Sequence, residues 1–149
     1  MQFPKKTTAV TPHLTVRDVQ SAVNFYEKAF GFTRKFMLPG ASGRIMHAEM
    51  GHEGCTIMIG PENLDRNMRS PMTAGGSPVS LFVYVADVDK LHERAVAAGA
   101  KELVAPNDQF FGARTTVVLD PDGHQWMFAQ HKKEVSVEDM TKAVRGGHV

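Results

Sequence analysis

Residues 120–127, DPDGHQWM, repeat the pattern of residues 51–58, GHEGCTIM, with a glycine at the fourth position and a methionine at the eighth. Their turn glycines, Gly54 and Gly123, are 69 residues apart, as are their final methionines, Met58 and Met127. The same offset of 69 residues joins VRDV at 16–19 to VADV at 85–88. A register kept from the start of a segment to its end predicts two copies of one supersecondary unit.

Each copy begins with a strand that leads into a helix. Alternation predicts strands at 10–16 and 79–85, and Asp18 and Asp87 are suited to cap the helices that follow. Shorter β-rich runs occupy 34–38, 45–50, 55–59, 102–105, 113–119 and 124–130. The pattern predicts an α+β fold of two βαβββ modules, at about 8–60 and 78–131. Neither module would bury enough core alone, so we expect one domain over 1–131, with 61–77 as a linker.

The tail, residues 132–149, contains a predicted helix at 136–144. Ser136 and Asp139 resemble a capping box, and Val137, Met140 and Val144 fall on one helical stripe. Docking of this helix on its own domain is favoured over binding to a partner.

Composition excludes several classes of function. The 149 residues carry a formal net charge of +1 with interspersed signs, which is unsuited to a nucleic-acid partner. There is no apolar run of the roughly 20 residues that a membrane span needs, and no secretory signal. Cys55 is the lone cysteine, so an intramolecular disulfide is impossible and a cytoplasmic location is expected.

Strand alternation separates a core face, under the helices, from a second face of mixed character. Cys55 and Trp126 are assigned to the core. A face with apolar walls and a few polar groups is typical of a ligand cleft. Arg114 is suited either to bind a carboxylate or phosphate or to pair with Glu49. The polar and aromatic residues assigned to the cleft are His13, His47, Glu49, Phe82, Tyr84 and Arg114.

Two stretches carry a family resemblance. HLTVRDVQSAVNFYEKAFGF at 13–32 and FFGARTTVVLDPDGHQWMFA at 110–129 resemble the opening and closing signatures of the vicinal oxygen chelate superfamily, which includes glyoxalase I, bleomycin-resistance proteins and extradiol dioxygenases. The sequence of these two stretches is most similar to the glyoxalase-like, PhnB-type branch of the superfamily. The resemblance implies paired βαβββ modules whose mixed sheets curl around a cleft.

Metal-dependent members of that superfamily take four ligands from the first and last strands of each module. The matching positions here are Thr11, Met58, Ser80 and Met127. Divalent cations prefer imidazole and carboxylate to hydroxyl and thioether, so no metal cofactor is expected. A displaced set of His13, His47 and Glu49 has suitable ligand types, although a polar cleft lining is the favoured interpretation.

These observations favour a metal-independent protein that binds a small amphipathic or aromatic molecule, as a homodimer, with Met58 and Met127 forming an adaptable apolar floor. No catalytic residue is assigned. The alternative is a lyase, isomerase or dioxygenase that uses a non-standard metal or an acid/base pair such as His47 and Glu49. A second alternative is an interaction module on the same fold.

Overall fold

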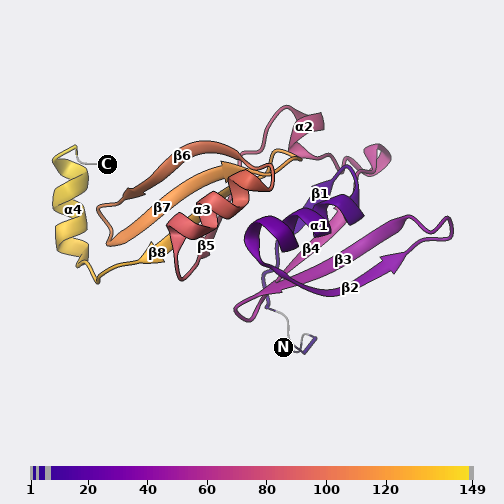
Figure 1. Cartoon of the computed structure of the whole chain (residues 1–149), viewed down its shortest axis with the longest axis horizontal. Coiled ribbons are helices and arrows are strands. Elements are labelled where there is room, and N and C mark those ends of the chain that lie inside the picture. The colour runs from indigo at the N-terminus through magenta and orange to yellow at the C-terminus, as the bar shows by residue number, and fades with distance from the viewer. Residues whose placement is uncertain (1, 3, 6–7, 148–149) are drawn as a thin grey trace.

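The computed structural model describes residues 2, 4, 5 and 8–147, and it is an α+β protein with two four-stranded sheets (Figure 1). The extreme ends of the expected domain and tail, residues 1, 3, 6, 7, 148 and 149, lie outside the described residues. The first sheet has the order β1-β4-β3-β2, with β1 His13–Val16, β2 Thr33–Pro39, β3 Ile45–His52 and β4 Cys55–Pro61. The second has the order β5-β8-β7-β6, with β5 Ser80–Tyr84, β6 Lys101–Asp108, β7 Ala113–Leu119 and β8 Gln125–His131.

The two sheets are built in the same way, so the repeat seen in the sequence is confirmed. In each sheet the first strand pairs in parallel with the last, and the remaining neighbours are antiparallel. His13 pairs with Met58, and at the equivalent place Phe82 pairs with Met127. Register shifts between β2 and β3 and between β6 and β7 increase the local twist and curl the sheets.

One long helix covers each sheet. The helix α1, Val19–Phe30, begins where the Asp18 carboxylate accepts the backbone N–H of Ser21. The helix α3, Val88–Ala97, begins in the same way, with Asp87 accepting the N–H of Lys90. Gly31 ends α1 with φ at 72°, a left-handed conformation that favours glycine.

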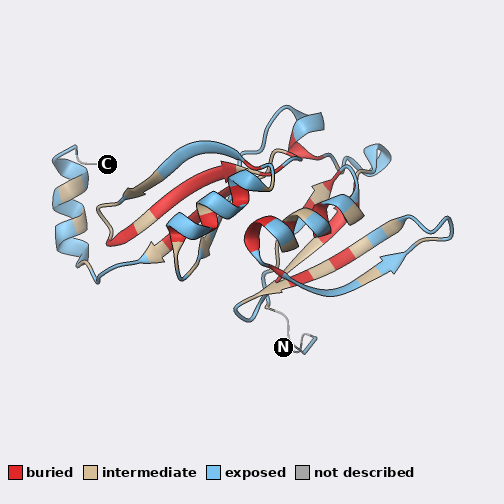
Figure 2. Ribbon diagram, in the orientation of Figure 1, coloured by how far each residue is buried: buried red, intermediate tan, exposed pale blue. Residues whose placement is uncertain are grey.

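The two modules share one core, which is rich in aromatic side chains. Trp126 of β8 is buried, as predicted, and its ring centroid lies 5.4 Å from that of Tyr26 and 5.1 Å from that of Phe30, both on α1. Figure 2 shows buried residues concentrated along the helices and the strands beneath them. Since the second module supplies the tryptophan that packs against the first module's helix, the two are held together by apolar burial.

Each sheet also has a face without a helix, which we call its open face. The open face of the first sheet carries His13, His47, Glu49 and Met58, and that of the second carries Ser80, Phe82, Tyr84 and Met127. In Figure 1 the sheets lie next to each other along the long axis, with α1 and α3 on the same side of the molecule. Both open faces are therefore turned to the opposite side.

The segments outside the modules are short. Between them the chain forms a 3-10 turn, η1 Leu64–Arg66, and one turn of helix, α2 Pro71–Ala74. The tail forms α4, Val137–Arg145, which projects from the end of the second module (Figure 1). None of its residues is buried, so the expectation that it docks on its own domain is wrong. No helix among the described residues is long and apolar enough to cross a membrane.

Candidate functional site

The first open face brings His13, His47 and Glu49 together. His13 lies on β1, while His47 and Glu49 lie two residues apart on β3 and therefore on the same side of the strand. The His47 Nε2 atom lies 3.0 Å from Oε2 of Glu49, and the two side chains are 26% and 16% exposed. The ring centroids of His13 and His47 are 6.1 Å apart. The sequence-based grouping of these three residues on one face is therefore confirmed.

The surroundings of His13 favour its neutral form. Its ring lies against Gly60, where an added Cβ would be 3.0 Å from Cε1 of the imidazole. Desolvation lowers the pKa of His13 below its ordinary value, and the neighbouring His47 lowers it further. At neutral pH this histidine therefore offers an uncharged ring nitrogen to the open face.

The second open face is aromatic. Phe82 and Tyr84 are 49% and 56% exposed, and their rings meet edge to face at 5.2 Å. Met127 lies beside Phe82 and is paired on its other side with Val117. Phe111, in the turn before β7, lies 6.4 Å from the Phe82 ring. These groups offer flat and adaptable apolar surface.

The four positions that hold metal ligands in the resembled family do not fit a divalent cation here. Thr11 and Met58 belong to the first module and Ser80 and Met127 to the second. The Thr11 hydroxyl donates to the backbone carbonyl of Thr8 at 3.0 Å. Two hydroxyls and two thioethers are poor ligands for a hard or borderline ion. Among the described residues there is also no group of three His, Cys, Asp or Glu side chains arranged to hold a metal.

Arg114 and Cys55 differ from expectation. Arg114 lies on the α3 side of the second sheet, where its Nε donates to Asp89 at 2.9 Å and its Nη1 to Asp108 at 3.3 Å. The predicted orientation toward the cleft is therefore wrong, and with it both alternatives for Arg114, binding of a ligand anion in the cleft and pairing with Glu49. The hydrogen bonds to Asp89 and Asp108 raise the pKa of Arg114 and keep it charged. Cys55 was assigned to the core, but it is exposed at the start of β4.

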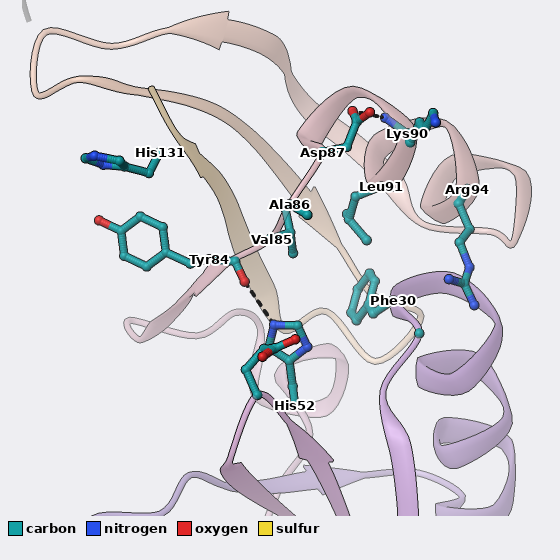
Figure 3. A pocket seen from close by; sticks show the side chains of 12 residues that line it. Phe30, His52, Tyr84, Val85, Ala86, Asp87, Lys90, Leu91, Arg94 and His131 are labelled. Atoms are coloured by element: carbon teal, nitrogen blue, oxygen red, sulfur yellow. Dashed lines mark hydrogen bonds between the residues drawn. The ribbon is translucent and has the colours of Figure 1, made fainter. Parts of the chain in front are cut away.

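A groove of about 710 Å³ separates the β3–β4 turn from α3 (Figure 3). His52 spans it by donating from Nε2 to the backbone carbonyl of Tyr84 at 2.9 Å. Arg94 forms another wall, but it is engaged, because Nε and Nη2 donate to the carbonyls of Lys28 and Glu27 at 2.6 and 2.9 Å. We therefore interpret this groove as a joint between modules.

The equivalent joint on the other side is closed by carboxylates whose partners the sequence did not reveal. Asp120 is buried and accepts the Tyr26 hydroxyl at 2.5 Å and the Trp126 indole N–H at 3.0 Å. Asp122 accepts the backbone and side-chain N–H groups of Arg17, both at 2.9 Å. Gly123 was correctly assigned to a turn, and the two aspartates of that turn also tie the modules together. Only the unusual density of carboxylates beside a tryptophan signalled this role.

Comparison with known proteins identifies the family. The family model of the Glyoxalase/Bleomycin resistance protein/Dioxygenase superfamily matches residues 8–128. The chain is similar to Mb0911c of Mycobacterium bovis, with 37% identity over 139 residues that cover 91% of each chain. Among solved structures it is similar to TioX from Micromonospora sp. ML1, with 28% identity, a TM-score of 0.66, and coverage of 83% of this chain and 98% of that one. The fosfomycin resistance protein FosX from Listeria monocytogenes, 16% identical with a TM-score of 0.62, shares the fold over 89% of this chain and 96% of its own. By its sequence, its paired modules and its curled sheets, the chain belongs to the glyoxalase/bleomycin resistance protein/dioxygenase superfamily.

Proposed function

We propose that the chain binds a small amphipathic or aromatic molecule, without a metal ion, in a cleft lined by its two open faces. One observation carries the proposal: the open faces combine exposed apolar side chains with a small, ordered polar group. Phe82, Tyr84 and Met127 supply the apolar surface, while His13, His47 and Glu49 supply polar atoms. Ligand sites are typically apolar with few polar groups that fix orientation.

The proposal includes a homodimer. Both open faces are turned to one side of the molecule, and aromatic groups such as Phe82 lie exposed on them. A two-fold axis across the middle of the long axis would place the first sheet of one copy against the second sheet of the other. Such a pairing would cover the exposed aromatic groups and enclose two clefts, each lined by both copies.

The proposed location is a reducing compartment such as the cytoplasm, because the Cys55 thiol of the protein is exposed.

The proposal is tested by titrating the protein with a panel of aromatic metabolites and drugs, with and without a chelator. We expect saturable binding and a rise in melting temperature that the chelator does not abolish. His47→Ala and Phe82→Ala should each weaken binding about tenfold or more, because each removes a contact worth roughly 1.4 kcal/mol.

His92→Ala is the matched control. His92 lies on α3, away from both open faces, and its Nε2 atom is 2.5 Å from Oε2 of Glu102. If no compound in the panel binds saturably, or if binding requires an added metal, the proposal is wrong.

The His47–Glu49 contact supports a second candidate, an acid/base enzyme. A carboxylate 3.0 Å from Nε2 holds the imidazole in one orientation, and His13 beside it is kept neutral. Such a pair is suited to proton transfer. If the chain is an enzyme, incubation with compounds that bind should convert one of them to product, detected by mass spectrometry. Glu49→Gln should then abolish conversion while binding persists. If the unaltered protein binds a compound and leaves it chemically unchanged, acid/base catalysis on that compound is excluded.

A further inference from the structure

A second cavity, of about 420 Å³, lies between the modules next to the groove of Figure 3. It is bounded by residues 8–12, by the turn between β3 and β4 with the start of β4, and by β5. It shares His52, Glu53 and Tyr84 with the groove. We call this cavity the joint pocket. Its volume is in the range of sites that bind small molecules.

The walls of the joint pocket are apolar and partly aromatic. Phe32 and Trp126, which are buried, line it from the side of the core. Phe82 and Tyr84 line it with rings that are half-exposed and meet edge to face. Aromatic rings of this kind offer flat surface to an apolar group, and their faces attract a cation.

The joint pocket has one carboxylate, that of Glu53, and no lysine or arginine among its lining residues. Lys90 and Arg94 line the neighbouring groove but not this pocket. Glu53 has φ at 46°, in the left-handed region where asparagine, aspartate or glycine is usual in a two-residue turn. In the part of the chain that the structure describes, its side chain takes part in no ion pair or hydrogen bond. A carboxylate beside an apolar pocket and without a cation favours a positively charged ligand group.

The internal repeat shows which group such a carboxylate binds in the other module. At the offset of 69 residues, Glu53 is equivalent to Asp122, and Arg17 is equivalent to Ala86. The Asp122 carboxylate accepts the backbone N–H and the guanidinium Nε of Arg17, both at 2.9 Å. Since Ala86 has no charged side chain, the first joint keeps the carboxylate of this pair and lacks its cation.

We infer that the joint pocket binds an aromatic amine, with the flat apolar group against Phe82 and Tyr84 and the ammonium group on the Glu53 carboxylate. The ammonium group then plays the part that the Arg17 guanidinium plays beside Asp122. The inference rests on the small-molecule binding proposed above and adds the charge of the ligand and its place. It does not require the homodimer, because one chain supplies the whole pocket.

Calorimetric titration with three compounds that share one ring system tests the inference. At neutral pH naphthylmethylamine is positively charged, naphthylmethanol is uncharged and naphthoate is negatively charged. We expect the amine to bind with a Kd about tenfold lower than that of the alcohol, and naphthoate to bind most weakly, because only the amine gains a charge-assisted contact with Glu53. Equal Kd values for the amine and the alcohol would overturn the inference.

Substitution of Glu53 tests the role of its carboxylate. Glu53→Gln should remove the preference for the amine and leave the Kd of the alcohol unchanged, whereas Glu53→Asp, which keeps the charge, should retain the preference. The matched control is Glu134→Gln, which removes a carboxylate from a side chain that is 96% exposed in the tail. A preference for the amine that persists in Glu53→Gln would overturn the inference. Thermal unfolding checks that each variant is folded.

Alkylation of Cys55 locates the bound amine. Cys55 lines the joint pocket and is the lone cysteine of the chain, so its reaction rate with iodoacetamide reports on this place alone. A saturating concentration of the amine should slow the reaction about fivefold or more, because the reaction depends on access to the thiol. The control protein carries Glu134→Cys in a Cys55→Ser background, and the amine should leave its reaction rate unchanged.

The possible failures are distinguishable from a failure of the proposed function. Binding of the amine without a change in the reactivity of Cys55 would overturn the joint pocket as its site and leave small-molecule binding intact. If none of the three naphthalene compounds binds, the inference is overturned, whereas the proposed function fails only when the wider panel of aromatic compounds fails as well.

Discussion

Asp120 acts as the main polar anchor of the fold. Its carboxylate accepts hydrogen bonds from the Tyr26 hydroxyl, the Trp126 indole and the backbone N–H groups of Asp122 and His124. Buried donors are costly when they lose their acceptor, whereas an exposed ion pair contributes little. A single carboxylate therefore fixes a helix of one module, a strand of the other and the turn between two strands.

Asp120→Ala should lower the free energy of unfolding by about 3 kcal/mol or more, because it leaves the Tyr26 and Trp126 donors without an acceptor. Urea denaturation measures the change. Glu134→Ala, at a side chain that is 96% exposed, is the control and should change stability by less than about 0.5 kcal/mol. Similar losses in both variants would contradict the assigned role of Asp120.

His13 should titrate below its ordinary pKa of 6.5, because desolvation and His47 both disfavour its charged form. Since folding lowers this pKa, the unfolded chain binds the proton more tightly. The resulting stability is present above about pH 6.5 and is lost as the pH falls through the folded-state pKa.

NMR titration of the His13 ring measures this pKa. His47→Ala should raise it toward 6.5, while His92→Ala should leave it in place. A His13 pKa at or above 6.5 in the unaltered protein would contradict the prediction.

At the scale of the secondary-structure elements, the carboxyl end of α1 is capped by a side chain of α3, that of Arg94. The Arg94 guanidinium donates to two of the last carbonyls of α1, and its Nη1 lies so close to Gly31 that a Cβ there would be 2.8 Å away. A cation at the carboxyl end of a helix also interacts favourably with the helix dipole. The helices of the two modules are therefore joined by a cap in addition to apolar contact.

Arg94→Ala should destabilise the protein by about 1–2 kcal/mol, through loss of two charge-assisted hydrogen bonds that are partly open to solvent. Thermal unfolding measures the loss. Lys90→Ala, one turn earlier on the same helix, should have little effect. If Arg94→Lys restored full stability, bidentate capping by the guanidinium would be excluded.

Some elements were predictable from sequence and others were not, for physical reasons. The repeat, the caps at Asp18 and Asp87 and the burial of Trp126 follow from local patterns that packing did not override. The orientation of Arg114 was mispredicted because β7 is buried on both sides and its threonines and valines give no contrast between faces. The contacts of Asp120 and the exposure of α4 depend on long-range packing, which a single sequence does not encode in any local spacing.

At the scale of the whole molecule, the shared core should make the two modules unfold as one. Trp126 packs against α1, and Asp120 and Asp122 bind Tyr26 and Arg17 across the joint. We expect Trp126 fluorescence and far-ultraviolet circular dichroism to report the same urea midpoint. Two separated transitions would show that the modules are stable independently. Arg17→Ala should shift both signals together.

The two joints between the modules are equivalent by the repeat but chemically unequal. Asp120 and Asp122 hold one joint, where the equivalent positions in the other are Gly51 and Glu53. A duplicated unit with two identical joints would restrict both turns equally. The β7–β8 turn holds its joint with buried carboxylates, whereas the β3–β4 turn holds the other through one exposed hydrogen bond, from His52 to the Tyr84 carbonyl. Within the β3–β4 turn Gly54 is restricted by its positive φ of 79°, so sequence change is expected to cost least stability at the exposed Cys55.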